Sequence, residues 1–230
     1  AVAYATNGED GWQKAINLVP DLIVTDLMMP GIDGLELCRH IRSNDVVNHI
    51  PIIIVTAKIS DQERIEGFEA GADAYLAKPF NVDELRTVVE RLLDRQRSLR
   101  NKFSDNATNT KEQQDEVQLT DTERRFLAKT VDHIYLLMDK QQLNVNTLAE
   151  KLCMSPRQLH RKIVTLTGSS PASFILKIKM KRARHLLETD PKMSIDDIAF
   201  CCGFEHTSSF YHAFRKKYGV TPRDVRRGID

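Results

Sequence analysis

Two patterns of apolar residues divide the chain. In residues 1–100, short apolar runs such as Asp21 to Thr25 and Ile50 to Val55 alternate with stretches of helical periodicity such as Asp61 to Ala70 and Val82 to Leu93. Strands that alternate with helices in this way build a parallel sheet covered by helices. The first hundred residues are therefore predicted to form an α/β domain.

The helix expected at Val82 to Leu93 has a recognisable start and one apolar face. Asn81 and Glu84 have the spacing of a capping box, in which each side chain binds a backbone N–H that the helix leaves unpaired. Apolar residues then recur at the i, i+3, i+4 spacing of one helical face: Leu85, Val88, Val89, Leu92 and Leu93. This face is predicted to pack on the sheet.

A polar stretch separates this domain from the rest of the chain. Residues 101–120 are rich in Asn, Thr, Gln and charge, and they show no periodicity long enough to pack, which is typical of a linker. The residues after it follow a helical pattern throughout. We predict an α/β domain at 1–100, a linker at 101–120 and an all-α domain at 121–230.

The helical region contains an internal repeat. Leu148-Ala149 recurs as Ile198-Ala199 fifty residues later, and six positions recur after fifty-one residues: Leu159 as Phe210, Ile163 as Phe214, Gly168 as Gly219, Ser170 as Thr221, Pro171 as Pro222 and Phe174 as Val225. Each copy holds a short helix, a turn and a second helix, which is the helix-turn-helix arrangement. A long helix from about Ala172 to Leu187 is predicted to join the two copies.

Composition narrows the class of protein. Apolar residues make up 41% of the 230 residues and charged residues 28%, which excludes a collagen-like, disordered or disulfide-stapled chain. Because the longest apolar runs are far shorter than the roughly 18 residues of a membrane span, we expect no membrane contact and a cytoplasmic location. The four cysteines lack the C-x-x-C spacing of a zinc site and are expected to be buried thiols: Cys38, Cys153, Cys201 and Cys202.

The net charge of +1 hides an asymmetry between the two ends of the chain. Residues 1–100 carry 16 acidic and 11 basic side chains, whereas residues 141–230 carry 8 acidic and 16 basic ones. A concentrated positive charge suits a polyanion, because each Lys or Arg placed at a phosphate releases condensed counterions. The last 90 residues are therefore expected to bind nucleic acid.

Three polar residues end three successive strands of the predicted sheet: Asp26 after DLIVT, Thr56 after IIIV and Lys78 after AYLA. The carboxyl ends of parallel strands meet at one edge of a sheet, so these side chains are expected to converge. A carboxylate can attack a phosphoryl group when a cation and a hydroxyl stabilise the phosphoryl oxygens. Taken alone, Asp26 would instead be interpreted as a helix cap or turn residue.

The segments DLIVTDLMMPGIDGLELC, PIIIVTAK and GADAYLAKPF together resemble the response-regulator receiver domain of two-component signalling. This resemblance implies a flavodoxin-like parallel sheet with the strand order 2-1-3-4-5. It also implies that Asp26 is the phosphoacceptor, Thr56 the switch hydroxyl, Lys78 the cation that binds the phosphoryl group and Tyr75 the switch aromatic, with a cis bond between Lys78 and Pro79.

The sequence departs from the receiver pattern at the expected metal site. By the resemblance, Mg²⁺ is held by Asp26, by the backbone carbonyl of Met28 and by an acidic pair at the end of the first strand. Val2 to Ala5 resembles the second strand, and Glu9 and Asp10 fall at the entry to the second helix, so the acidic pair is absent. We expect a sheet without its first strand and weak or no binding of Mg²⁺. A fragment and a degenerate receiver both explain this.

The two copies of the repeat, LAEKLCMSPRQLHRKIVTLTGSSPASF and GFEHTSSFYHAFRKKYGVTPRDVRR, resemble the AraC/XylS-type DNA-binding domain. The second helix of such a unit enters the major groove, where Arg meets guanine and Gln meets adenine. The candidate DNA-binding residues are Arg157, Gln158, His160 and Arg161, then His206, Thr207, Ser208, Ser209 and His212, and finally Arg215, Lys216 and Lys217, which are better placed for phosphates. The repeated positions Leu159, Ile163, Phe210 and Phe214 are assigned to the core.

Together these features predict a two-component response regulator that acts as a transcription factor and not as an enzyme. A histidine kinase would phosphorylate Asp26, and this would control sequence-specific binding of double-stranded DNA; a homodimer is a further expectation. Two alternatives stay open, a fragment of a hybrid sensor kinase and a degenerate receiver that dimerises without accepting phosphate. A haloacid-dehalogenase-type enzyme fits poorly, because it needs an Asp where this chain has Met28.

Overall fold

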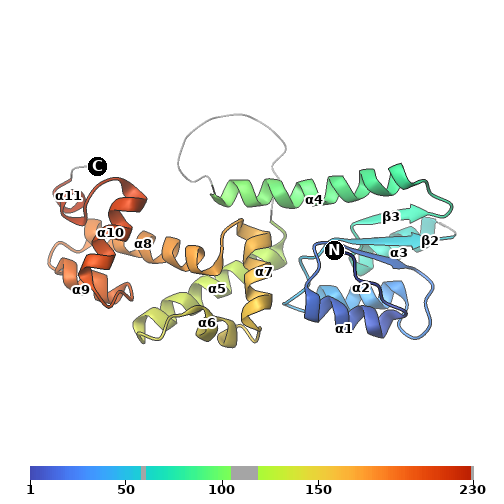
Figure 1. Cartoon of the computed structure of the whole chain (residues 1–230), viewed down its shortest axis with the longest axis horizontal. Helices are drawn as coiled ribbons and strands as arrows, with labels where there is room; N and C mark the ends of the chain where they lie inside the picture. Colours follow the sequence, from blue (N-terminus) through green and yellow to red (C-terminus); the bar gives the residue numbers. More distant parts are fainter. Residues whose placement is uncertain (58–60, 105–118, 229–230) are drawn as a thin grey trace. The chain divides into compact units, whose positions relative to one another are not determined.

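The structure is a computed structural model that describes residues 1–57, 61–104 and 119–228 (Figure 1). Contacts within the chain define two compact units, one of residues 1–124 with 157–169 and one of residues 125–156 with 170–230. The elements are α1 (Gly8–Leu18), β1 (Ile23–Asp26), α2 (Gly34–Ser43), β2 (Ile52–Thr56), α3 (Asp61–Ala70), β3 (Ala74–Ala77), α4 (Val82–Ser104), α5 (Asp121–Asp139), α6 (Val145–Lys151), α7 (Pro156–Thr167), α8 (Pro171–Thr189), α9 (Ile195–Cys201), α10 (Thr207–Tyr218) and α11 (Pro222–Arg226).

The first unit is built on a parallel sheet with the order β1-β2-β3 (Figure 1). Ile23 of β1 pairs with Ile52 of β2, and Ile53 of β2 pairs with Ala74 of β3. Strand β2 is buried at every residue, because it has a strand on each side and helices over both faces. The predicted α/β sheet is confirmed.

Helix α4 covers one face of this sheet. Its residues Leu85, Val88, Val89 and Leu92 pack against a buried cluster of Ile53, Val55 and Leu76. At its start the backbone N–H of Glu84 donates to Oδ1 of Asn81 over 2.6 Å, which is the Asn81 half of the predicted capping box. The helix continues to Ser104, so it extends beyond Leu93 into the predicted linker. The rest of that linker up to residue 118 lies outside the described residues.

Residues Val2 to Ala5 do not form a strand, and this part of the prediction is wrong. In the order 2-1-3-4-5 another strand would lie between this segment and β1. Among the described residues the paired strands are β1 with β2 and β2 with β3, so the segment has no neighbour that supplies ladder hydrogen bonds. Its side chains are exposed, as Val2 and Tyr4 show at 78% and 81%.

The second unit is all-helical, and its core lies between α8, α9, α10 and α11. Leu187, Ile198, Phe210 and Phe214 belong to this core, together with Met180, Ala183, Ala199, Cys202 and Val225. The ring centroids of Phe210 and Phe214 lie 5.6 Å apart.

The repeat is confirmed by the positions of the helices. Helices α6 and α9 begin fifty residues apart, and α7 and α10, like α8 and α11, begin fifty-one residues apart. The repeated apolar positions are buried in both copies: Leu159 and Phe210, Ile163 and Phe214, and Phe174 and Val225.

The turn inside each helix-turn-helix copy contains a left-handed residue. It is Gly203 in the second copy, with φ +71°, and Cys153 in the first, with φ +55°. The backbone hydrogen bonds correspond, since the N–H of Cys153 donates to Glu150 and that of Gly203 donates to Phe200. The first copy therefore places a residue with a Cβ atom where glycine carries no steric penalty.

We expect Cys153→Gly to stabilise the protein by about 1 kcal/mol, because a residue with a Cβ atom in the left-handed conformation costs about 1 to 2 kcal/mol. The measurement is the midpoint of denaturant unfolding. Cys153→Ala is the matched control, since it removes the thiol and keeps the Cβ atom. Equal midpoints for the two variants would contradict the argument.

The four cysteines are free thiols, and two of them are buried. Burial raises the pKa of Cys38 to about 11 and that of Cys202 to about 12, so both thiols are held un-ionised at neutral pH. Cys153 is exposed and Cys201 is partly exposed, and the expectation of burial is wrong for Cys153. The turn that gives Cys153 its left-handed backbone also holds its side chain at the surface.

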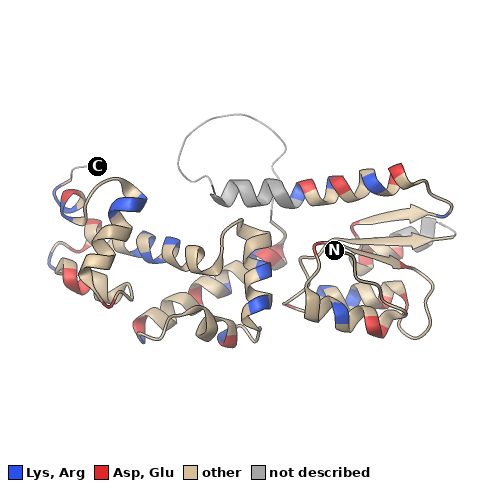
Figure 2. Cartoon of the chain, in the orientation of Figure 1, with Lys and Arg blue, Asp and Glu red and all other residues tan. Residues whose placement is uncertain are grey.

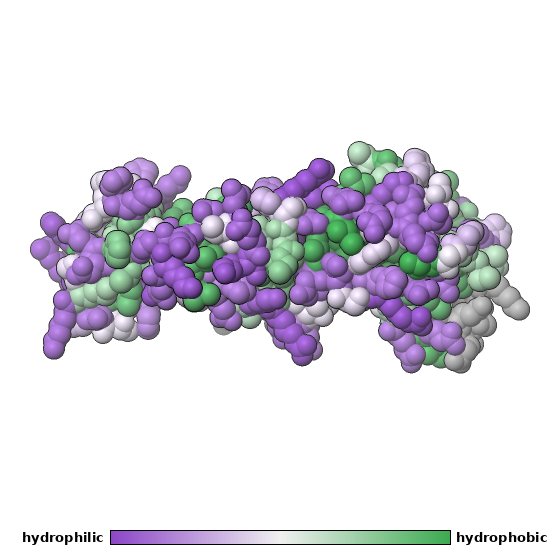
Figure 3. All heavy atoms as spheres, turned by 90° about the horizontal axis from the view of Figure 1, so that it is seen from below, coloured by the Kyte–Doolittle hydropathy of each residue, from purple (hydrophilic) through white to green (hydrophobic). Residues whose placement is uncertain are grey.

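None of the helices in the described part of the chain is both long enough and apolar enough to cross a membrane. Figure 3 shows mostly hydrophilic residues on the face that it displays, with apolar residues in smaller patches.

Candidate functional site

The carboxyl edge of the sheet brings together the predicted phosphorylation residues. Asp26 and Thr56 are the last residues of β1 and β2, and Lys78 directly follows β3. The Lys78 ammonium lies 2.5 Å from Oδ2 of Asp26, and the Lys78 backbone N–H donates to the Thr56 carbonyl over 2.7 Å. The predicted convergence of these three residues is thus present in the fold.

The loop after Asp26 holds this edge close to α2. A Cβ atom on Gly34 would lie 2.4 Å from the Asp26 carbonyl oxygen, so only glycine fits at the start of this helix. The neighbouring Asp33 caps α2 by accepting a 2.8 Å hydrogen bond from the Glu36 N–H. Asp33 therefore caps the helix that follows the turn, whereas Asp26 pairs with Lys78.

Asp26 is held in its ionised form. Burial pushes its pKa up, but the hydrogen bond and the charge of Lys78 outweigh burial and bring the pKa below the ordinary value. The ion pair therefore stabilises the fold above the ordinary carboxyl pKa and is lost as the pH falls through the lowered one. Asp26 stays an anion across the neutral range.

Tyr75 lies against α3. A Cβ atom on Gly67 would fall 1.1 Å from the Tyr75 hydroxyl, and the Phe68 ring meets the Tyr75 ring edge-on at a centroid distance of 5.4 Å. Burial raises the pKa of the phenol to about 12. Gly67 therefore makes the room that this tyrosine occupies. The Lys78–Pro79 bond is cis, as the resemblance implied.

The residues near Asp26 fit a magnesium site incompletely. The resemblance to receiver domains implies a Mg²⁺ ion beside Asp26, and this ion prefers six oxygen ligands. The described residues contain no group of three or more His, Cys, Asp or Glu that could hold a metal ion, and the Asp26 carboxylate is paired with Lys78. Asp10 serves α1 instead, where its carboxylate accepts from the Thr6 N–H and from Lys14.

Helix α10 presents the predicted DNA-binding residues of the second copy on a polar face. Its buried face contains Phe210 and Phe214, while the polar candidates His206, Ser208, Ser209 and His212 are exposed and Thr207 is partly exposed. Arg215, Lys216 and Lys217 are exposed in its last turn, where basic residues also interact favourably with the helix dipole (Figure 2). The exposed polar and basic side chains of this helix suit base edges and phosphates.

Helix α7 carries the candidates of the first copy in two environments. Arg157 and His160 are exposed. Gln158 donates to the Ile16 carbonyl over 2.9 Å, and Arg161 donates to the Leu18 carbonyl over 2.5 Å, both within the first compact unit. Two of the four predicted base-reading side chains thus have acceptors in the protein.

Several basic residues of the C-terminal region serve the protein itself. The ammonium of Lys162 is buried and donates to the Asp45 carbonyl and to Oδ1 of Asn48, and burial lowers its pKa to about 7. Lys179 donates to the Gly203 carbonyl, and Arg182 pairs with Asp139. The sequence charge of this region therefore overstates the number of cations that DNA can reach.

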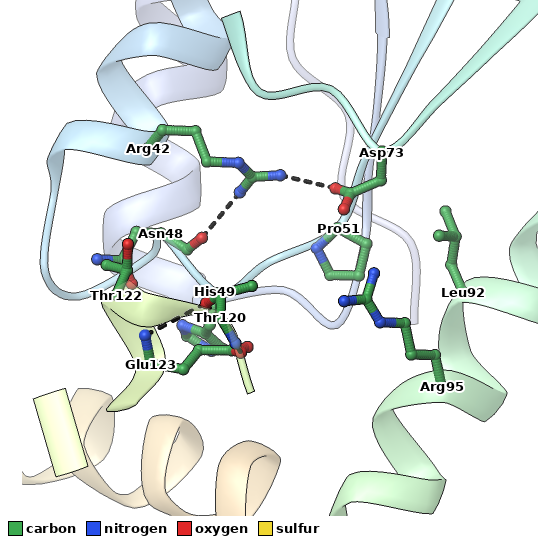
Figure 4. Close-up of a pocket in the computed structure, with 10 residues that line it drawn as sticks. All are labelled: Arg42, Asn48, His49, Pro51, Asp73, Leu92, Arg95, Thr120, Thr122 and Glu123. Carbon is green, nitrogen blue, oxygen red and sulfur yellow. Dashed lines mark hydrogen bonds and ion pairs between the residues drawn. The ribbon is translucent and has the colours of Figure 1, made fainter. Parts of the chain in front are cut away.

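A cavity of about 190 Å³ opens at the opposite edge of the sheet, where Pro51 and Asp73 precede β2 and β3 (Figure 4). Arg42 binds the carbonyls of Gly71, Asn48 and Ile50 and forms a 2.6 Å ion pair with Asp73. These polar groups of the cavity wall are therefore bonded to one another.

Comparison with known proteins agrees with this architecture. Residues 1–90 match the model of the response regulator receiver domain, and residues 148–228 match a helix-turn-helix domain. The chain is 36% identical to the transcriptional regulatory protein ResD of Bacillus subtilis over 73% of its own length and 83% of that protein. It is 34% identical to histidine kinase P4 of Formosa agariphila over 96% of its own length, but spans only 16% of that kinase.

Among solved structures, an AraC-type transcriptional regulator from Chromobacterium violaceum is 26% identical, with a TM-score of 0.42, over 48% of this chain and 96% of that one. The chain belongs to the response regulators, and it joins a receiver domain to a helix-turn-helix domain. This combination is typical of transcription factors that are not enzymes.

Proposed function

We propose that the chain is the output part of a two-component pathway, in which phosphorylation of Asp26 by a histidine kinase controls sequence-specific binding of duplex DNA. The observation that carries the proposal is the contact of Lys78 with Asp26 beside Thr56, in a chain that also exposes the polar face of α10. A cytoplasmic location and a homodimer are part of the same proposal.

The transfer uses the Asp26 carboxylate as the nucleophile. Its oxygen forms the new bond to phosphorus while the bond from phosphorus to the phosphohistidine nitrogen breaks, and the imidazole leaves with the electron pair and takes up a proton. The Lys78 ammonium and the Thr56 hydroxyl stabilise the phosphoryl oxygens. The lowered pKa of Asp26 keeps the nucleophile ionised.

DNA recognition uses α7 and α10 as a pair of recognition helices. Helix α8 joins the two copies, and its 19 residues span about 28 Å at a rise of 1.5 Å each. Two major-groove segments on one face of DNA lie about 34 Å apart. We propose that Arg157, His160 and Arg161 read one segment, and that His206, Ser209 and His212 read the other.

The acceptors of Gln158 and Arg161 support control of this binding. Both side chains must give up the Ile16 and Leu18 carbonyls before they can reach base edges. A change in the first unit that weakens these hydrogen bonds would therefore free half of the α7 candidates.

Binding-site selection from random duplex DNA tests the proposed assignment. Arg157→Ala should cost about 1 to 3 kcal/mol and relax the preference at one or two positions, because a base contact is lost. Lys216→Ala should weaken all sequences about equally, because a phosphate contact carries no sequence information. If Arg157→Ala keeps the preference at every position, that residue is a phosphate contact. If the chain selects no sequence at all, the proposed function is wrong.

A hybrid sensor kinase is the second candidate for the whole protein. The match to histidine kinase P4 over 96% of this chain favours it, because a receiver and a helix-turn-helix domain would then lie within a much longer protein. A degenerate receiver that dimerises without phosphate is a third candidate, and the incomplete metal site favours it.

A further inference from the structure

The turn between α9 and α10 is held by side chains from outside its own helix-turn-helix copy. Within the copy, the Gly203 N–H donates to the Phe200 carbonyl over 2.8 Å, and the Phe204 N–H donates to the Ala199 carbonyl over 3.0 Å. These bonds close the turn locally. The Phe200 carbonyl accepts a second hydrogen bond, and the Gly203 carbonyl accepts one, each from a residue far away in the sequence.

The first of these donors is Gln141, just beyond the end of α5. Its backbone is left-handed, with φ +54°, and its N–H donates to the Met138 carbonyl over 2.9 Å, so it terminates α5. Its side-chain Nε2 donates to the Phe200 carbonyl over 2.7 Å, across 59 residues of sequence. The end of α5 is thereby tied to the end of α9.

The second donor is Lys179 of α8. Its ammonium donates to the Gly203 carbonyl over 2.7 Å and lies 4.9 Å from the centroid of the Phe204 ring. A Cβ atom on Gly203 would lie 3.3 Å from this ammonium and 3.4 Å from Cγ of Met138. The turn is therefore seated closely against both α8 and α5.

A third contact joins α8 directly to α5. Arg182, one helical turn after Lys179, forms a 2.8 Å ion pair with Asp139 at the end of α5. Its guanidinium carbon also lies 5.5 Å from the centroid of the Tyr135 ring. We call Gln141, Lys179 and Arg182 the polar bracket.

We propose that the polar bracket is a specificity determinant, which fixes how the second recognition helix is phased relative to the first on DNA. The reason is connectivity: α5 leads directly into α6, and α8 directly follows α7, so both helices border the first copy. The bracket joins each of them to the turn of the second copy. The inference rests on the proposed function, because it concerns how that function selects its site.

The bracket does more than add stability. The apolar core of α8, α9, α10 and α11 already holds the second copy together, but apolar packing is non-directional. Hydrogen bonds are directional and lose strength when their angle changes, so they favour one orientation of the turn on α5 and α8. Polar contacts within an otherwise apolar interface can fix how two packed helices line up with each other.

The experiment measures the preference of the full 230-residue chain for half-site spacing. Duplexes would carry the two selected half-sites with one base pair inserted or removed between them, which rotates one half-site by about 34°. The wild type should bind the selected spacing about tenfold more tightly than either shifted spacing. In Gln141→Asn with Lys179→Met this ratio should fall to about threefold or less.

The variants separate positioning from folding. Gln141→Asn keeps an amide and a residue that tolerates the left-handed backbone, but it is one methylene too short to reach Phe200. Lys179→Met keeps the length and loses the charge. Lys181→Met is the matched control on the same helix and should leave the spacing ratio unchanged. Lys179→Arg keeps the positive charge and should therefore keep most of the wild-type spacing ratio.

The outcomes are distinct. If the bracket variants bind more weakly but keep the tenfold ratio, the inference is overturned, whatever their thermal stability. If the double variant fails to fold, Gln141→Asn alone decides, and an unchanged ratio overturns the inference. If the wild type binds no DNA, the proposed function itself fails, which is a different result.

Discussion

Raising the salt concentration from about 50 to about 200 mM should weaken the binding of a selected duplex by the full chain about a hundredfold. Arg215, Lys216 and Lys217 are exposed at the end of α10, and Arg223 is exposed in α11. About four phosphate contacts give a logarithmic salt slope of about −3.6. The measurement is fluorescence anisotropy of labelled DNA across a salt series.

Two variants serve as controls for this prediction, because they should affect the salt slope differently. Lys216→Ala should make it shallower by about one, because one phosphate contact is lost. Lys162→Met should leave the slope unchanged, because the Lys162 ammonium is buried and bonded to Asp45 and Asn48. An affinity that changes less than about threefold over the series would exclude phosphate contacts as the main source of binding.

Asp26→Asn should abolish phosphoryl incorporation from acetyl phosphate, because the amide has the shape of the carboxylate but is not a nucleophile. The wild-type chain should label weakly, since the described residues contain no group of three or more side chains that could hold a metal ion. Intact-mass spectrometry with and without hydroxylamine detects the acyl phosphate.

Asp21→Asn is the matched control, because Asp21 is exposed and precedes β1 while Asp26 ends it. This variant should label as the wild type does. Labelling of Asp26→Asn at the wild-type level would show a different acceptor. Lys78→Met should reduce labelling and raise the pKa of Asp26 toward the value that burial alone would give it.

Much of the fold was predictable because it depends on local patterns. The apolar face of α4 and the Asn81 cap are visible as residue spacing, and the structure has both. The sequence repeat predicted the paired helices, because apolar residues recur at matching positions. Phe210 and Phe214 are buried in the second copy, as Leu159 and Ile163 are in the first. The exception is Val2 to Ala5, where strand formation depends on a neighbour and not on the segment itself.

The convergence of the three polar residues that end the strands was predictable for a geometric reason. Parallel strands end at one edge, so Asp26, Thr56 and Lys78 had to meet wherever the sheet formed. The hydrogen bonds of single cations within the protein were not predictable, because Lys162 and Lys179 find their partners across 114 and 24 residues respectively. No periodicity in the sequence marks a contact of that kind.

The contiguity of α8, α9, α10 and α11 has a consequence for the order of folding. These helices occupy a single stretch of sequence and pack mainly on one another, whereas the sheet requires Ile23 to find Ile52 and Ile53 to find Ala74. Contacts between residues close in sequence form faster, because less loop-closure entropy is lost before they are made. During synthesis the sheet emerges first, yet the C-terminal helices should acquire protected amides sooner once the whole chain is released.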